Sequence, residues 1–92
     1  MSKIAIYPGT FDPITYGHMD IIKRSLKIVD HLVIAVAKNL NKNSLFNVIE
    51  RIDIVKNDIS LLNNINSKIK VTELSGLLTT FAKNQNATCI IR

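Results

Sequence analysis

The residue types best suited to chemistry gather in positions 7 to 18, which read YPGTFDPITYGH. This stretch holds two Pro, two Gly, two Thr, one Asp and one of the two histidines of the chain. The glycines and prolines favour a tight, preset backbone path. His18 and the hydroxyl groups of Thr10 and Thr15 can donate hydrogen bonds to phosphate oxygens. The stretch is therefore a candidate phosphate-binding loop.

An apolar-periodic run follows this loop and predicts a helix that opens at Gly17 and His18. The first turn of a helix presents free backbone N–H groups and the positive end of the helix dipole, and both favour anions. Each residue alone also has a purely structural interpretation, because Pro, Gly, Asp and Thr commonly form turns and caps and surface histidines are common. The combination favours phosphate binding. The loop is neither a Walker loop nor a GxGxxG loop.

The elements that must position this loop alternate between strand and helix. Short apolar runs predict strands, and apolar residues spaced three and four apart predict helices. The expected strands are residues 3–7, 32–37, 69–73 and 87–91, and the expected helices are residues 17–29, 48–62 and 77–85. This order predicts an α/β fold with a parallel sheet and right-handed crossovers. The candidate loop then lies at the carboxyl end of the first strand, where α/β proteins bind ligands.

Two details refine the predicted fold. Asn47 and Glu50 form a variant of the capping box and mark the start of the second helix, and Ser75 or Gly76 precedes the third. We expect residues 1–92 to form a single α/β domain without an internal boundary. Doubly wound sheets usually have five or six strands. The fourth strand runs to the end of the sequence, so we expect a fold truncated after that strand.

The composition is that of a globular chain, with 47% hydrophobic and 21% charged residues. The net charge of +5 raises the alternative of a nucleic-acid module. The lysines, however, are spread along the chain and are not interleaved with aromatic residues. The 15 Ile, 10 Asn and 9 Lys indicate a general bias of composition. We therefore expect small anionic ligands and no nucleic acid.

The cysteine and hydropathy patterns bear on the compartment. Cys89 is the one cysteine, and its apolar run, ATCII, predicts a buried small hydrophobic residue. No His and Cys residues have the spacing of a zinc site, so no metal ligand is predicted. No apolar stretch reaches the roughly 18 residues of a membrane span, and Pro8 and Gly9 argue against a signal peptide. We expect a cytoplasmic protein that does not enter a membrane.

At this level of detail the sequence resembles a known family. YPGTFDPITYGH is similar to the signature of the phosphopantetheine adenylyltransferases, and TYGH matches the TxGH version of the HxGH nucleotidyltransferase motif. DHLVIAVAKN resembles the second strand of that family, FNVIERIDIV its second helix, and LLTTFAKNQNATCIIR its third helix and fourth strand. The resemblance covers the whole chain and implies the N-terminal part of a Rossmann-like nucleotidyltransferase fold.

The resemblance implies an activity and a site. The family transfers AMP from ATP to 4′-phosphopantetheine, giving dephospho-coenzyme A and pyrophosphate, and uses Mg²⁺. Thr10 would bind the acceptor phosphate and neighbour ATP, and Phe11 would contact ATP through its backbone. His18 would bind the ATP phosphates and stabilise the transition state. The family also forms a hexamer, a dimer of trimers.

Three further positions are implied to bind the acceptor. Lys42 would hold it from the loop after the second strand, Leu78 would line the pantetheine arm through its backbone, and Arg92 would bind it at the end of the fourth strand. Without the resemblance, Lys42 would be a solvated loop charge. Leu78 would then be a core residue and Arg92 a frayed terminus.

The sequence also departs from the family. The loop KNLNKNSLF lacks the Pro that the family often has there. After the position of Arg92 the family continues with Gly, a second Arg, an acidic helix and a serine-rich segment that grips the ATP phosphates. Two alternatives therefore stay open. One is a related nucleotidyltransferase with another phosphate acceptor, such as nicotinate mononucleotide or glycerol phosphate, and the other is an inactive nucleotide- or phosphate-binding fragment.

Overall fold

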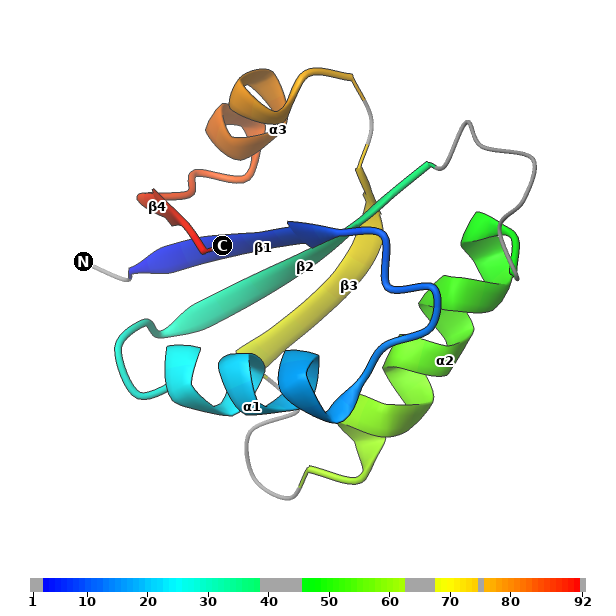
Figure 1. The fold of residues 1–92 in the computed structure, drawn as a ribbon. Helices are drawn as coiled ribbons and strands as arrows, with labels where there is room; N and C mark the ends of the chain where they lie inside the picture. Colours follow the sequence, from blue (N-terminus) through cyan, green and yellow to red (C-terminus); the bar gives the residue numbers. More distant parts are fainter. Residues whose placement is uncertain (1–2, 39–45, 63–67, 75, 92) are drawn as a thin grey trace.

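The computed structural model describes residues 3–38, 46–62, 68–74 and 76–91. Strands and helices alternate along these residues, as the sequence predicts (Figure 1). The elements in chain order are β1 (Ile4–Gly9), α1 (Tyr16–Ser25), β2 (His31–Ala37), α2 (Val48–Ser60), β3 (Ile69–Leu74), α3 (Leu78–Asn84) and β4 (Cys89–Ile90). The fold class is confirmed as α/β.

The strands form one parallel sheet with the order β3-β2-β1-β4. β1 therefore lies between β2 and β4, and the chain runs in one direction across the sheet from β1 to β3 before β4 pairs with the other side of β1. The strand order reverses at β1. In open α/β sheets, ligands bind outside the carboxyl ends of the strands at such a switch point. The loop after β1 begins at this point.

Helices cover both faces of the sheet, with α1 and α2 on one face and α3 on the other (Figure 1). Side chains alternate between the faces along a strand. In β2, Leu32, Ile34 and Val36 pack in the core on the side of α1 and α2, whereas Val33 and Ala35 pack in the core that includes Phe81 of α3. This alternation explains why the run LVIAVA is apolar on both faces.

The helix ends follow local capping chemistry. The Asn47 side chain accepts from the backbone N–H of Glu50, and the Glu50 carboxylate accepts from that of Asn47, which confirms the predicted capping box. α1 ends at Ser25, four residues earlier than predicted, and a turn follows it. α3 begins after Leu77, which makes no side-chain cap, while Gly76 takes a left-handed φ of 71° in the preceding turn.

The prediction that Cys89 is buried is wrong, because the residue is exposed. β4 spans two residues rather than the predicted five, and it lies at the edge of the sheet, paired with β1. An apolar run identifies a strand, but it does not say whether other elements cover both of its faces. Cys89 therefore lies on the surface of the described chain.

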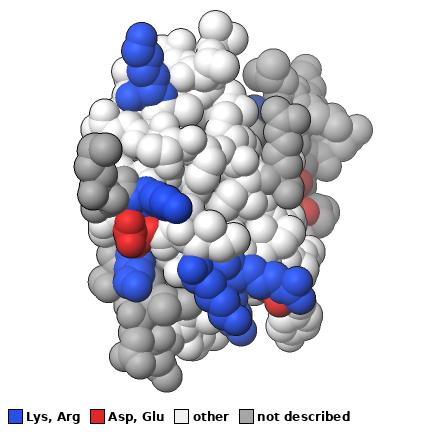
Figure 2. Space-filling model, turned by 90° about the vertical axis from the view of Figure 1, so that its left-hand side faces the viewer, with Lys and Arg blue, Asp and Glu red and all other residues white. Residues whose placement is uncertain are grey.

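The charged surface and the lengths of the helices concern the predicted ligands and the predicted lack of a membrane span. Figure 2 shows the face at the amino ends of the strands, where Lys and Arg side chains form separate groups with uncharged surface and acidic side chains between them. Of the helices in the described residues, none has the length and apolar character needed to cross a membrane.

Candidate active site

The loop after β1 follows a constrained path at the carboxyl edge of the sheet. Pro8 and Gly9 still pair with β2, opposite Ala35 and Val36, and Thr10 is the first exposed residue after the strand. Phe11 then takes a φ of 49°, in the left-handed region that a bulky residue seldom adopts. The peptide bond between Asp12 and Pro13 is cis.

The side chain of Phe11 anchors this path in the core. It is 2% exposed, and its ring meets that of Tyr7 edge-on at a centroid distance of 5.3 Å and that of His18 at 4.8 Å. Gly9 makes room for the ring, because a Cβ at this position would lie 2.9 Å from Phe11 Cε2. Phe11 therefore holds the loop through its side chain and leaves its backbone for other contacts.

His18 takes part in the N-terminal cap of α1. Thr15 is the N-cap, and its Oγ1 accepts from the backbone N–H of His18 at 3.3 Å. In return, the backbone N–H of Thr15 donates to Nδ1 of His18 at 3.0 Å. A backbone N–H can only donate, so Nδ1 must be the unprotonated nitrogen of the ring. The ring proton of the neutral imidazole is then on Nε2.

The protonation state of His18 follows from the same surroundings. Burial lowers the pKa of the imidazole below its ordinary value of 6.5, because partial removal from water disfavours the charged form. At neutral pH the ring is a neutral donor through Nε2–H. It stands beside the first turn of α1, whose backbone N–H groups and dipole favour an anion. This arrangement suits the oxygen of a bound phosphate.

The structure brings together three of the predicted site residues, Thr10, Phe11 and His18. Thr10 and Phe11 are consecutive, and Phe11 contacts the ring of His18. Leu78 is the first residue of α3, which follows the carboxyl end of β3, and it packs against the core around Phe81. Lys42 and Arg92 lie outside the described residues, so their roles stay predictions.

One site-adjacent residue, Arg51, was not identified from the sequence. Its side chain is 1% exposed and donates hydrogen bonds to the carbonyl oxygens of Thr10 and Ala37. Its position in the sequence could have indicated burial, because Arg51 follows Val48 and precedes Val55 at the spacing of one helical face. A charge on a buried stripe indicates a specific set of partners.

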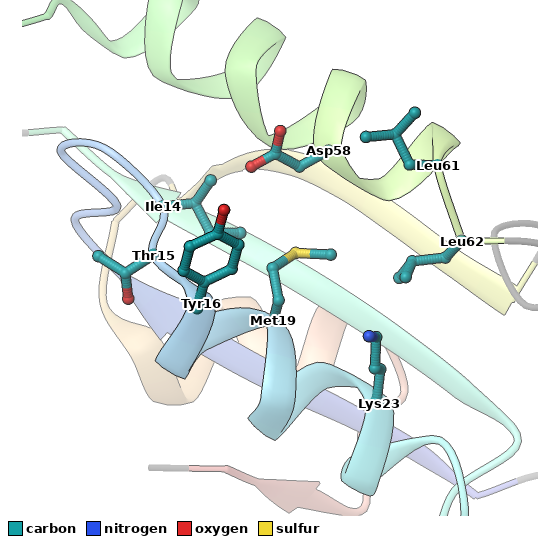
Figure 3. A pocket seen from close by; sticks show the side chains of 8 residues that line it. All are labelled: Ile14, Thr15, Tyr16, Met19, Lys23, Asp58, Leu61 and Leu62. Atoms are coloured by element: carbon teal, nitrogen blue, oxygen red, sulfur yellow. The ribbon is translucent and has the colours of Figure 1, made fainter.

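A groove of about 680 Å³ lies beside the site, between α1 and α2. Figure 3 shows side chains from the two helices facing one another across it, with Met19 and Lys23 on α1 and Asp58 on α2. Thr15 lines the groove, but Thr10, Phe11 and His18 do not. The groove therefore adjoins the loop after β1 through Ile14 and Thr15, but it does not include the three predicted site residues.

Fold and loop together define the class: an open α/β protein with a candidate anion site at the N-terminus of its first helix, at the switch point of a parallel sheet. Comparison with known families makes the assignment specific. The family model described as cytidylyltransferase-like matches residues 6–92. The chain therefore belongs to the cytidylyltransferase-like family.

Individual relatives agree with this assignment. The chain is 50% identical over 90 residues to the phosphopantetheine adenylyltransferase of Geobacter metallireducens. These aligned residues cover 98% of this chain and 53% of that protein. It is 49% identical over 92 residues to the protein of the same name from Buchnera aphidicola subsp. Schizaphis graminum, covering 100% and 54%. The predicted resemblance is confirmed, and the chain spans about half the length of these curated relatives.

Solved structures show the same fold. The nicotinic acid mononucleotide adenylyltransferase of Plasmodium falciparum, complexed with NaAD, superimposes with a TM-score of 0.78 at 25% identity, over 97% of this chain and 50% of that one. The lipopolysaccharide core biosynthesis protein of Thermoplasma volcanium gives a TM-score of 0.74 at 21% identity, over 98% and 73%. The prediction of a Rossmann-like nucleotidyltransferase fold is confirmed.

Proposed function

We propose that this chain acts in phosphopantetheine adenylyl transfer, moving AMP from ATP to 4′-phosphopantetheine with release of pyrophosphate. The observation that carries the proposal is the identity of 50% to a curated phosphopantetheine adenylyltransferase over 98% of the chain. The geometry of the loop after β1 supports it independently, because the neutral imidazole of His18 is a donor at the N-terminus of α1, beside the exposed Thr15. Both features suit a nucleotide phosphate.

The proposed reaction needs positioning more than proton transfer. The acceptor phosphate is already an anionic nucleophile, so its oxygen attacks the α-phosphorus of ATP while the bond to pyrophosphate breaks, and no general base is required. Nε2–H of His18 and the first turn of α1 would donate to the phosphoryl oxygens as charge shifts toward pyrophosphate. Thr10 and the backbone of Phe11 would hold the phosphates of the two substrates on either side of the reacting atom.

Two cationic side chains, Lys42 and Arg92, belong to the proposed acceptor site. Lys42 and Arg92 would bind the acceptor and offset the repulsion between two polyanions, and Leu78 would line the pantetheine arm. Mg²⁺ enters as part of the ATP substrate, coordinated through the nucleotide phosphates, as is usual for this ion. In the described residues, His, Cys, Asp and Glu do not gather in groups of three that would form a separate metal site.

Approximate magnitudes show which effect dominates. Correct positioning of two reactants can lower a barrier by about 7–11 kcal/mol. One preorganised donor to a developing negative charge contributes about 3–4 kcal/mol. On this scale His18 is an important contributor, but most of the acceleration would come from holding ATP and the acceptor in line.

A second candidate function is nucleotide or phosphate binding without turnover. It is the inactive alternative that the sequence leaves open, and the chain spans about half the length of its curated relatives. A different acceptor is less well supported, because identity to the Plasmodium nicotinic acid mononucleotide adenylyltransferase is 25%. The cytoplasmic location and the hexamer of the family stay predictions for this chain, and light scattering would determine its oligomeric state.

A competition assay tests the proposal. The chain is incubated with ATP and Mg²⁺ and with 4′-phosphopantetheine, nicotinate mononucleotide or glycerol phosphate in turn, and the adenylylated products are separated by chromatography. We expect dephospho-coenzyme A as the main product. Turnover with another acceptor instead would overturn the choice of substrate. Binding of ATP by a folded chain that forms no product would favour the second candidate.

A further inference from the structure

Arg51 is buried at the centre of the loops that surround the candidate site. Its side chain is 1% exposed and lies on the face of α2 that carries Val55 and Ile59 toward the sheet. Removing a charged group from water is costly unless hydrogen bonds compensate for the lost hydration. The partners of this guanidinium therefore reveal what its burial achieves.

The hydrogen bonds of Arg51 join three separate segments. Nη1 donates to the carbonyl oxygen of Thr10 at 2.7 Å and to that of Ala37 at 2.9 Å, and Nε donates to that of Phe46 at 3.2 Å. Thr10 follows β1, Ala37 ends β2, and Phe46 precedes the N-cap of α2. We call Arg51 and these three residues the Arg51 clamp.

The bond to Thr10 sets the direction of one peptide group in the site. In a trans peptide the C=O and the next N–H point in opposite directions. Because the carbonyl of Thr10 points at the buried guanidinium, the N–H of Phe11 points away from that guanidinium. Phe11 has a positive φ at this peptide group, and its side-chain ring is buried in the core.

The other two bonds hold the end of β2 and the segment before α2. One guanidinium binds the carbonyl oxygens of Ala37 and Phe46. Asp12 adds a second connection, because its Oδ1 accepts from the backbone N–H of Phe46 at 3.1 Å. Ala37 and Phe46 are therefore both tied to the loop after β1, which carries Thr10 and Asp12.

We propose that Arg51 is a positioning residue, whose buried guanidinium fixes the nucleotide-binding loop after β1 relative to the carboxyl end of β2 and the start of α2. This inference rests on the proposed function, since that function assigns the loop after β1 to the nucleotide. The clamp would hold the reacting phosphates in line without touching them. A lysine cannot replace this arginine, because its single ammonium does not offer donors in a planar fork.

The test compares Arg51→Lys with Arg24→Lys, the same substitution at an exposed arginine of α1 that pairs with Asp20 at 3.0 Å. Two readouts are taken at a temperature at which circular dichroism shows each variant folded. The first is the amide NMR spectrum, which needs no turnover. The second is the kcat and the KM for ATP and for 4′-phosphopantetheine.

We expect Arg51→Lys to shift the amide signals of Phe11 and Lys38, whose peptide groups contain two of the three carbonyls of the clamp. We also expect kcat/KM to fall by about 10- to 100-fold, the range for a small misplacement of reacting groups. Both substrates should be affected, and Arg24→Lys should match the wild type. Guanidinium ion at millimolar concentration should restore part of the activity of Arg51→Ala without a change in its folded fraction.

Two results would overturn the inference. One is a folded Arg51→Lys variant whose Phe11 and Lys38 amide signals match the wild type. The other is a variant with shifted amide signals but wild-type kcat and wild-type KM for both substrates, which would give Arg51 a purely structural role. If the wild-type chain itself shows no turnover with any acceptor, the proposed function fails, and the amide spectra still decide whether the clamp orients the loop after β1.

Discussion

Replacement of Thr15 by Ala separates the structural and chemical roles of the cap on α1. The Oγ1 of Thr15 accepts from the backbone N–H of His18 at 3.3 Å and lies 3.1 Å from Nδ1 of its ring. Loss of an N-cap hydroxyl costs about 1 kcal/mol of folding stability. In a domain of this size, that cost lowers the Tm by roughly 4–8 °C.

The catalytic effect of Thr15→Ala can be estimated separately. One neutral hydrogen bond contributes about 0.5–1.5 kcal/mol. If the hydroxyl orients the imidazole for the transition state, its loss lowers kcat/KM by about 2- to 12-fold, since about 1.4 kcal/mol corresponds to a factor of ten. Thr15→Ser keeps the hydroxyl and should retain most of the activity.

Asn47→Ala provides the matched control. Asn47 caps α2 with the same reciprocal pattern and a shorter bond of 2.8 Å, so its loss should cost at least as much stability. Thermal unfolding and pyrophosphate release are measured for all three variants while each is folded. We expect the larger loss of activity in Thr15→Ala. An equal or greater loss in Asn47→Ala would refute the idea that Thr15 acts through His18.

Two other predictions concern the same loop. Gly9→Ala should destabilise the fold by about 1–3 kcal/mol in denaturant titrations, because the new Cβ would lie 2.9 Å from Cε2 of the buried Phe11 ring; wild-type stability would contradict the packing of Phe11. For His18, the folded-state pKa is lowered, so its contribution to stability is present above pH 6.5 and is lost as the pH falls. Denaturant titrations should therefore show that the free energy of unfolding of the wild type falls on acidification, and that it falls less in His18→Gln. Nitrogen NMR shifts should place the proton of the neutral ring on Nε2.

Much of the fold could be predicted from the sequence because hydrophobic periodicity reports local structure directly. The spacing of Val48, Ile52 and Val55 and the Asn47–Glu50 pair located α2 and its first residue. The order of the strands was not predictable in the same way, since it depends on which edge of the sheet receives β4. The switch point at β1 therefore became evident only in three dimensions.

The candidate site, too, could be predicted only in part from the sequence. The residue types of the loop after β1 indicated phosphate chemistry, and its spelling indicated the family. The sequence did not reveal that Nδ1 of His18 is occupied by the N–H of Thr15, which determines the ring tautomer. It also did not reveal the partners of Arg51, because they are backbone carbonyls that leave no pattern in the side chains. The exposure of Cys89 was mispredicted because burial of an edge strand depends on what covers it.

The central claim is that the loop after β1 is a working adenylyl-transfer site. The most direct test measures pyrophosphate release from ATP and Mg²⁺, with and without 4′-phosphopantetheine, for the wild type, His18→Ala and His31→Ala. His31 is the other histidine, exposed at the opposite end of the sheet, and serves as the control. We predict acceptor-dependent release that collapses in His18→Ala and persists in His31→Ala. Release that is unchanged in His18→Ala, or no release from a folded wild-type chain, would contradict the claim.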